Sequence, residues 1–187
     1  RILALTAGLA PILFTGAVRA AETYKIDPSH SSVVFKTGHM QVATAWGRFN
    51  QFAGTLALDE EAPESSSVTL TVKAASVDTN NEKRDQSLRG TDFFDAREFP
   101  DITFESVAVE KTGGKTYQIR GKLTLLGETK EVVADFTFNG TGVHLGSKKP
   151  IAGGDAVLTI KRSDFGMKYG IPNIGDEVTL YISIEAA

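Results

Sequence analysis

Hydrophobic and polar residues alternate along most of the chain from Tyr24 onward. Between Val68 and Ala74, for example, aliphatic side chains occupy every second position, and two threonines and a lysine stand between them. Successive side chains of a β-strand point to opposite faces, so this period of two is typical of strands with one buried face. The pattern predicts about eight strands, over residues 32–37, 46–58, 68–74, 102–110, 117–125, 132–138, 156–160 and 178–184.

Short glycine-containing turns separate the middle strands. The sequences KTGGKT (111–116) and LGET (126–129) are typical of hairpin loops in which glycine supplies a positive φ. Short hairpins in series predict an antiparallel meander. One helix is predicted over Asn80–Gly90, because Asn80 or Asn81 can cap its start and Gly90 can end it.

These elements predict an all-β fold: an eight-stranded antiparallel barrel with one short helix. A two-sheet sandwich is the alternative, since the same strands can pack in either way. The barrel is favoured because closure leaves no unpaired sheet edge. The interior of an eight-stranded barrel can be filled by side chains or can hold one small ligand.

The first twenty residues differ from the rest. Arg1 is followed by an apolar run from Ile2 to Ala17 and by small residues before a cleavage point after Ala20 or Ala21. This order is typical of a secretory signal peptide, and an uncleaved membrane anchor is the alternative. We therefore expect a signal peptide over residues 1–20, a single domain over residues 21–187, and a periplasmic or secreted protein.

Composition narrows the classes of function. The 187 residues are 41% hydrophobic and 23% charged and carry a net charge of −3, so no basic face for nucleic acid is expected. The chain has 0 cysteines, which excludes disulfides, thiol nucleophiles and thiolate metal sites. Burial of apolar surface must therefore stabilise the fold.

Five segments carry a resemblance to a known family. They are YKIDPSHSSVVF, GRFNQFAGTL, RDQSLRGTDFFDAREFPDITF, RSDFGM and IGDEVTLYISIEA, in this order between Tyr24 and Ala186. Together they resemble the YceI-like family of exported polyisoprenoid-binding proteins. The resemblance implies a lipocalin-like barrel whose interior holds a long isoprenoid or a similar amphiphile. It also implies that the interior is hollow, which the alternation by itself does not show.

Phenylalanines are concentrated in and around the segment that follows the predicted helix. Any single one can be an ordinary core residue. As a group they suit the lining of an apolar pocket, because Phe93, Phe94 and Phe99 lie in an irregular segment beside a helix that could act as a lid. The candidate apolar ligand-binding residues are Phe35, Phe49, Phe52, Leu88, Phe93, Phe94, Phe99, Phe104, Phe136 and Phe138.

Three further candidates are polar or amphipathic. Trp46, His39 and Arg84 are predicted to meet the polar head group of the ligand. Charges beside Arg84 can instead form a network that fixes the junction of helix and loop. No metal site is predicted, because His30 and His39 lack zinc-site spacing and show no evident acidic partner.

The resulting hypothesis is an exported protein that carries or sequesters a polyisoprenoid, such as an isoprenoid quinone or a prenyl phosphate. The ligand is the only bound group expected, with no other cofactor. Transient contact with a membrane and a homodimer are compatible with it. The alternatives are an exported enzyme acting on a lipid-like or amide substrate in the same cavity, and a purely structural barrel with a filled core. No nucleophile-elbow sequence supports the enzyme.

Overall fold

The computed structural model describes residues 21–187. Strands dominate it, with one α-helix and three short 3-10 turns. The strands are β1 (Glu22–Lys25), β2 (Ser32–His39), β3 (Ala43–Phe49), β4 (Phe52–Leu58), β5 (Ser67–Lys73), β6 (Val77–Asp78), β7 (Asp101–Lys111), β8 (Thr116–Leu125), β9 (Glu128–Val143), β10 (Pro150–Lys161) and β11 (Ile174–Ala186). The helix is α1 (Glu82–Arg89), and the turns are η1 (Pro63–Ser65), η2 (Ala74–Ser76) and η3 (Arg162–Phe165).

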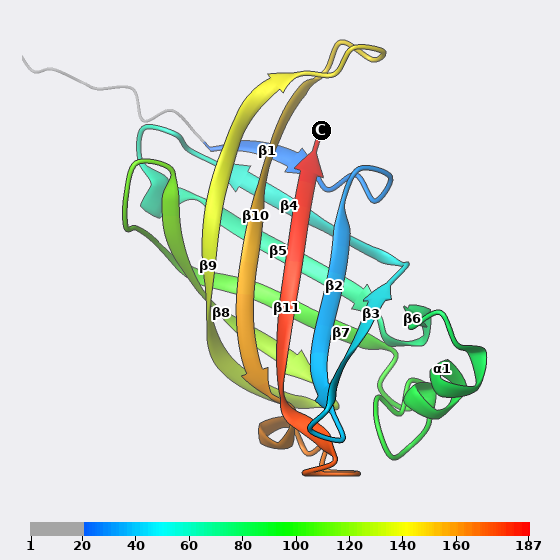
Figure 1. The fold of residues 1–187 in the computed structure, drawn as a ribbon. Helices are drawn as coiled ribbons and strands as arrows, with labels where there is room; N and C mark the ends of the chain where they lie inside the picture. The colour runs from blue at the N-terminus through cyan, green and yellow to red at the C-terminus, as the bar shows by residue number, and fades with distance from the viewer. Residues whose placement is uncertain (1–20) are drawn as a thin grey trace, which may run out of the picture.

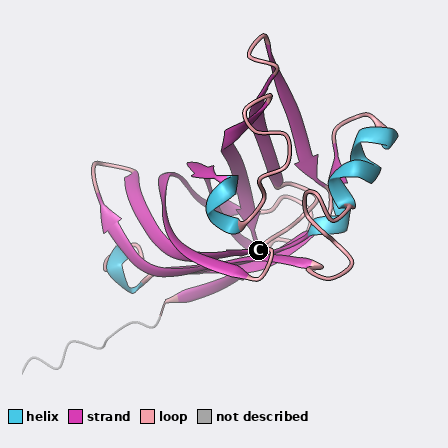
Figure 2. Ribbon diagram, turned by 90° about the horizontal axis from the view of Figure 1, so that it is seen from below, coloured by secondary structure: helices cyan, strands magenta, loops and turns pink. Residues whose placement is uncertain are grey.

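All strands belong to one antiparallel sheet that curls over itself. Its order is β1-β4-β5-β7-β8-β9-β10-β11-β2-β3-β6. In Figure 1, β9, β10, β11 and β2 run upright in front, and β4, β5 and β7 cross behind them. The view from below shows the same curl (Figure 2), with the longest helix to the right of it. The all-β, barrel-like prediction is confirmed.

The predicted count of eight strands is wrong, because the described residues form eleven. The predicted strand 46–58 is interrupted at Asn50 and Gln51, which separates β3 from β4. There the backbone turns to the β5–β6 connection, where Asn50 N–H donates to the carbonyl of Ser76 and Lys73 N–H to that of Gln51. The other two additions, β1 and β6, are too short to show a recognisable alternation.

The local predictions for helix and turn agree with the structure. Asn81 precedes α1, and its side chain accepts a 3.0 Å hydrogen bond from the N–H of Arg84. Gly90 follows the helix as its C-cap. In the turn between β8 and β9, Leu126 and Gly127 both have positive φ, of 53° and 76°, which matches the twist of a tight hairpin.

Buried apolar side chains gather in two regions inside the curl. One lies between β2, β3, β4 and β5 and includes Phe35, Phe49 and Phe52. The other lies at the end of β8 and includes Phe93, Leu125 and Phe165. Within residues 21–187, no helix is long and apolar enough to cross a bilayer. The predicted signal peptide lies outside the described residues.

Candidate ligand cavity

A cavity of about 430 Å³ occupies the space between the two layers of the sheet. Its wall is almost entirely apolar. The aliphatic and aromatic residues that line it are Val33, Phe35, Phe49, Leu56, Leu58, Val68, Leu70, Val72, Leu88, Phe93, Phe94, Ile102, Phe104, Val109, Tyr117, Ile119, Leu123, Leu125, Ala134, Phe136, Phe138, Ala156, Leu158, Ile160, Met167, Ile174, Val178, Leu180, Ile182 and Ile184.

The inward face of β11 shows that this space is not filled by the protein. Val178, Leu180, Ile182 and Ile184 all point to the cavity, yet each is only half-buried. In a close-packed core such side chains would be fully enclosed by neighbours. Their remaining exposure is to the cavity, so the barrel has a large apolar wall with no protein partner.

One end of the cavity is closed by irregular segments. Phe93 is buried there and meets Tyr169 edge to face, with ring centroids 5.4 Å apart. Phe94 meets Phe49 in the same manner, also with centroids 5.4 Å apart. The chain following α1 and the chain following η3 thus close this end together.

Arg162 organises the closing segment that follows η3. It is buried, and its guanidinium donates hydrogen bonds of 2.8–3.0 Å to four backbone carbonyls: those of Met167, Tyr169, Ile174 and Gly175. Burial lowers the pKa of Arg162. Because carbonyls at the end of a barrel have no strand partner, this side chain supplies the donors that the closed end needs.

The cavity reaches the surface at its other end. Among its lining residues, only Glu60, Ser67, Lys111, Gly114 and Lys115 are exposed. They lie on the β4–β5 connection and the β7–β8 hairpin. Strand pairing places this mouth far from the closed end, because β7 runs from Asp101, opposite Lys73, to Lys111 over 11 residues.

The mouth carries the polar groups that the interior lacks. Lys111 and Lys115 stand at the rim with Glu60 and Asp59, so both signs of charge are present. Lys115 Nζ also donates a 3.2 Å hydrogen bond to the carbonyl of Asn139. Asp59 is held by its own loop, where its Oδ1 accepts hydrogen bonds from the N–H groups of Glu61 and Ala62. An elongated molecule with an apolar tail and a polar head matches this arrangement.

Residues 24–186 match the model of the YceI-like domain. The chain belongs to the YceI-like family. Protein YceI of Salmonella newport (strain SL254) is 38% identical over 180 residues, which cover 95% of this chain and 93% of the relative. The crystal structure of BcnA from Burkholderia cenocepacia superposes with a TM-score of 0.79 at 28% identity, over 87% of this chain and 99% of that one.

A third comparison concerns the fold alone. A polyisoprenoid binding domain from Saccharophagus degradans, implicated in plant cell wall breakdown, superposes with a TM-score of 0.65. Its sequence is 16% identical, and the match covers 87% of this chain and 97% of that one. The two sequences therefore form a similar fold with little sequence identity.

Most of the predicted apolar site residues line the cavity of this YceI-like domain. Those that do are Phe35, Phe49, Leu88, Phe93, Phe94, Phe104, Phe136 and Phe138. The structure brings them together from four strands, β2, β3, β7 and β9, and from the segment around α1. Phe93 and Phe94, however, lie at the closed end, away from the exposed lining residues. That the cavity opens by movement of the segment 80–100 stays a prediction.

Two predicted apolar residues lie outside the lining. Phe52 is buried within the packed core between β4 and β5. Phe99 is half-buried, and the turn residue Gly127 approaches its ring so closely that a Cβ on that glycine would lie 2.9 Å away. Phe99 thus anchors the segment after α1 to the β8–β9 hairpin.

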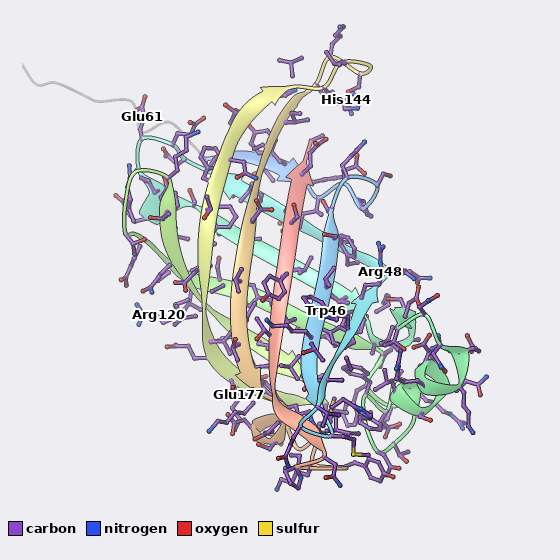
Figure 3. The ribbon with its side chains drawn as sticks, in the orientation of Figure 1. Trp46, Arg48, Glu61, Arg120, His144 and Glu177 are labelled. Atoms are coloured by element: carbon purple, nitrogen blue, oxygen red, sulfur yellow. The ribbon has the colours of Figure 1, made fainter. Side chains whose placement is uncertain are left out.

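The three predicted head-group residues also lie outside the lining. Trp46 is on the outer face of β3 (Figure 3), 51% exposed, with its ring 5.9 Å from that of Tyr181. His39 is exposed at the end of β2. Arg84 donates from Nε and Nη2 to the hydroxyl and carbonyl of Thr79, at 2.7 and 2.6 Å, which fixes the start of α1. Arg84 therefore takes part in a network that fixes the junction of helix and loop, which was the alternative interpretation of the sequence.

Sequence reasoning missed Arg162 and the residues of the mouth. The RSDFGM segment contains Arg162, but nothing in its spacing shows that four carbonyls from the following residues converge on it. Lys111 and Lys115 flank a predicted hairpin, where lysines are common at exposed positions. Only the curl of the sheet places that hairpin beside the β4–β5 connection.

Proposed function

We propose that the protein binds an isoprenoid lipid in this cavity and carries or sequesters it outside the cytoplasm. The observation that carries the proposal is the hollow, apolar interior with a single polar rim. Ligand pockets of this kind commonly enclose about 300–1,000 Å³, and the cavity of about 430 Å³ falls in that range. The domain from Saccharophagus degradans, described as polyisoprenoid binding, has the same fold.

The physical basis is shelter of a hydrocarbon tail from water. Each buried CH₂ is worth about 0.8 kcal/mol relative to water, so a long tail is strongly favoured inside the cavity. A bilayer interior is equally dry, so transfer from membrane to cavity changes the free energy little. Loading and release can then be reversible, which suits a carrier that contacts the membrane transiently.

The direction of the bound lipid follows from the polarity of the two ends. In this proposal the tail extends toward Phe93 and Phe94, where the Arg162 guanidinium donates to four backbone carbonyls. The head group lies at the mouth near Lys111 and Lys115. A quinone carbonyl or a prenyl phosphate can accept hydrogen bonds from a lysine there.

The experiment is mass spectrometry of an organic extract from freshly purified protein. An intact isoprenoid present at near one molecule per chain supports the proposal. The absence of any lipid from the extract, together with no rise in melting temperature on adding an isoprenoid quinone, would contradict it. Conversion of the added lipid into a product would indicate the enzyme instead.

A further inference from the structure

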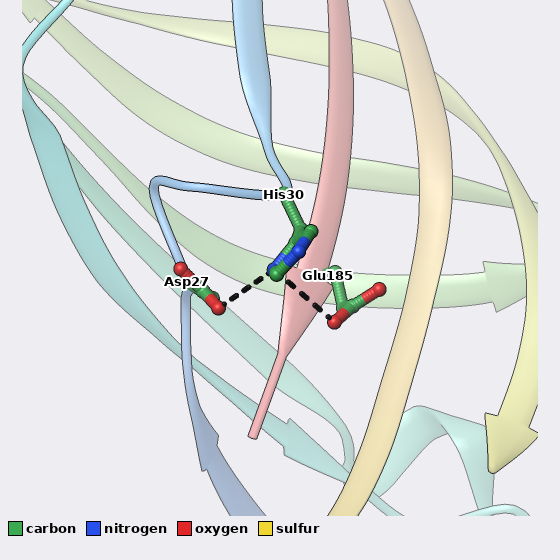
Figure 4. A group of neighbouring side chains, drawn as sticks. All are labelled: Asp27, His30 and Glu185. Carbon is green, nitrogen blue, oxygen red and sulfur yellow. Dashed lines mark hydrogen bonds and ion pairs between the residues drawn. The ribbon is translucent and has the colours of Figure 1, made fainter. Parts of the chain in front are cut away.

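Three side chains from distant parts of the chain meet outside the cavity. Asp27 and His30 lie on the connection between β1 and β2, and Glu185 lies near the end of β11. Each offers one ligand atom, and these three atoms lie within 4.8 Å of one another. Figure 4 shows the imidazole of His30 between the two carboxylates.

Two carboxylates face the same ring nitrogen of His30. His30 Nδ1 lies 2.9 Å from Asp27 Oδ2 and 3.7 Å from Glu185 Oε1. One ring nitrogen holds one proton, so it can form a good hydrogen bond with only one of the two carboxylates. The Glu185 carboxylate forms an ion pair with His30 at 3.7 Å, which is longer than a hydrogen bond.

A tetrahedral zinc ion with ligands at 2.0–2.2 Å separates neighbouring ligand atoms by about 3.4 Å. The separations of 2.9 and 3.7 Å from His30 Nδ1 lie on either side of that value, and the two carboxylate oxygens lie within 4.8 Å of each other, so side-chain rotations would bring the three atoms to this geometry. One imidazole and two carboxylates are ligands that zinc accepts, and the imidazole disfavours Mg²⁺ and Ca²⁺.

The backbone holds the three residues in place before any ion binds. Asp27 N–H donates to the carbonyl of Glu185 at 2.8 Å, and the hydroxyl of Ser31 bonds both the carbonyl and the N–H of Glu185. Asp27 Oδ1 accepts a 2.8 Å hydrogen bond from Ser29 N–H, which leaves Oδ2 to face His30. A preorganised ligand set loses little entropy on binding.

His144 is close but is not part of the ligand set. Its ring centroid lies 6.1 Å from that of His30. Its Nδ1 accepts a 3.0 Å hydrogen bond from Ser147 N–H, so the proton of the neutral ring is on Nε2. A protonated nitrogen cannot ligate a metal, and water would complete the coordination at this partly exposed site.

We propose that Asp27, His30 and Glu185 form a binding site for a divalent transition metal ion, with Zn²⁺ as the best fit. The ion would join the β1–β2 connection to Glu185 on β11, which lies 154 positions after Ser31 in the sequence. In a chain with 0 cysteines, it would supply a cross-link between the two ends of the domain. This site is independent of the cavity and of its ligand.

The test is calorimetric titration of ZnCl₂ into the tag-free, EDTA-treated protein. One ion per chain is expected, with affinity reduced at least ~10-fold in His30→Ala and in Glu185→Gln. Glu185→Gln keeps the backbone bonds and the Asp27–His30 pair, so it tests the site without loss of the fold. His39→Ala, which removes an exposed histidine at the far end of β2, is expected to bind as the unaltered protein does.

A second measurement does not depend on heats of binding. Excess ZnCl₂ at about 100 times the dissociation constant is expected to raise the melting temperature by roughly 5–10 °C, and this rise is lost in Glu185→Gln. Absence of binding to the unaltered protein, equal binding by His30→Ala, or equal competition by MgCl₂ would overturn the proposal. An equal loss of affinity in His144→Ala would overturn the three-residue ligand set.

Discussion

The ring of Phe93 packs edge to face on the ring of Tyr169, with centroids 5.4 Å apart. Phe93 belongs to the segment after α1 and Tyr169 to the segment after η3, so the contact joins the two irregular pieces that close the cavity. Irregular segments rearrange more readily than a paired strand does. The closed end is therefore a second place, besides the mouth, where the cavity could open.

Charge placed in the lining is expected to prevent lipid retention. In Phe94→Asp, an unpaired carboxylate would stand at the apolar end of the cavity, which costs several kcal/mol when a tail covers it. Lipid recovered in the organic extract should fall at least about tenfold. Phe99→Asp, on the same segment but outside the lining, should retain its lipid if circular dichroism shows a folded protein. Equal retention by both variants would contradict the assigned position of the tail.

Filling the cavity is expected to cost binding without costing stability. Ala156 lines the cavity and is half-buried, so the larger side chain of Ala156→Phe should extend into empty space. The free energy of unfolding of Ala156→Phe should stay within about 1 kcal/mol of that of the unaltered protein, while the amount of bound lipid falls. Ala152 on the same strand is 2% exposed in packed core. There Ala152→Phe should destabilise by about 1–3 kcal/mol through overpacking. A similar destabilisation at both positions would show that the interior is filled.

The closed end should depend strongly on Arg162. Arg162→Met leaves four carbonyls without their donors, so we expect a loss of about 3 kcal/mol or more in urea unfolding. Arg120→Met provides the matched control. Its guanidinium forms a 2.9 Å ion pair with Glu110 on the surface, and such pairs are worth about 1 kcal/mol or less. A comparable loss in the free energy of unfolding of the two variants would contradict the proposed role of Arg162 in stabilising the closed end.

Trp46 should not affect lipid binding. It lies outside the lining, where Lys36 Nζ stands 5.7 Å from its ring. Trp46→Ala should lower the free energy of unfolding by about 1 kcal/mol and leave the recovered lipid unchanged. The comparison variant is Phe136→Ala, which removes a ring that does line the cavity. A loss of lipid in Trp46→Ala would restore its predicted role at the head group.

Asp78 should make the junction of β6 and α1 sensitive to acid. Hydrogen bonds from Asn80 N–H (2.9 Å) and then from Asn50 Nδ2 (3.0 Å) lower the pKa of Asp78 below its ordinary 3.8. A carboxylate with a lowered pKa stabilises the folded state above 3.8, and this stabilisation is lost as the pH falls through the lowered value. The melting temperature of the unaltered protein should therefore exceed that of Asp78→Asn near neutral pH. The difference should shrink below about pH 3.8, and a constant difference would exclude the carboxylate as its cause.

Local patterns predicted most of the strands and the helix correctly. The alternation from Val68 to Ala74 and the caps Asn81 and Gly90 depend on neighbours a few residues away, so one sequence is sufficient to find them. The break at Asn50 and Gln51 was missed, because it is stabilised by Ser76 and Lys73 from another segment. Short strands such as β6 exist only through their pairing with a distant strand.

Some of the residues that line the cavity could likewise be found from local patterns. Phe136 and Phe138 share a face of one strand, so both line the cavity. Trp46 and Phe49 lie on opposite faces of β3, and the sequence around them shows no alternation from which to assign these faces. The mouth at Lys111 and Lys115 depends on which hairpin the curl of the sheet brings beside the β4–β5 connection.

The amino-acid sequence by itself determined where strands, turns and helix form and which family the chain belongs to, because these depend on short-range patterns and on motifs in order. The tertiary structure alone decided that the barrel is hollow, that its mouth lies opposite Phe93, and that Glu185 meets Asp27 and His30. Each of these depends on the register and curl of strands paired across more than a hundred residues. That pairing sets the distance between facing walls, and no local pattern records it.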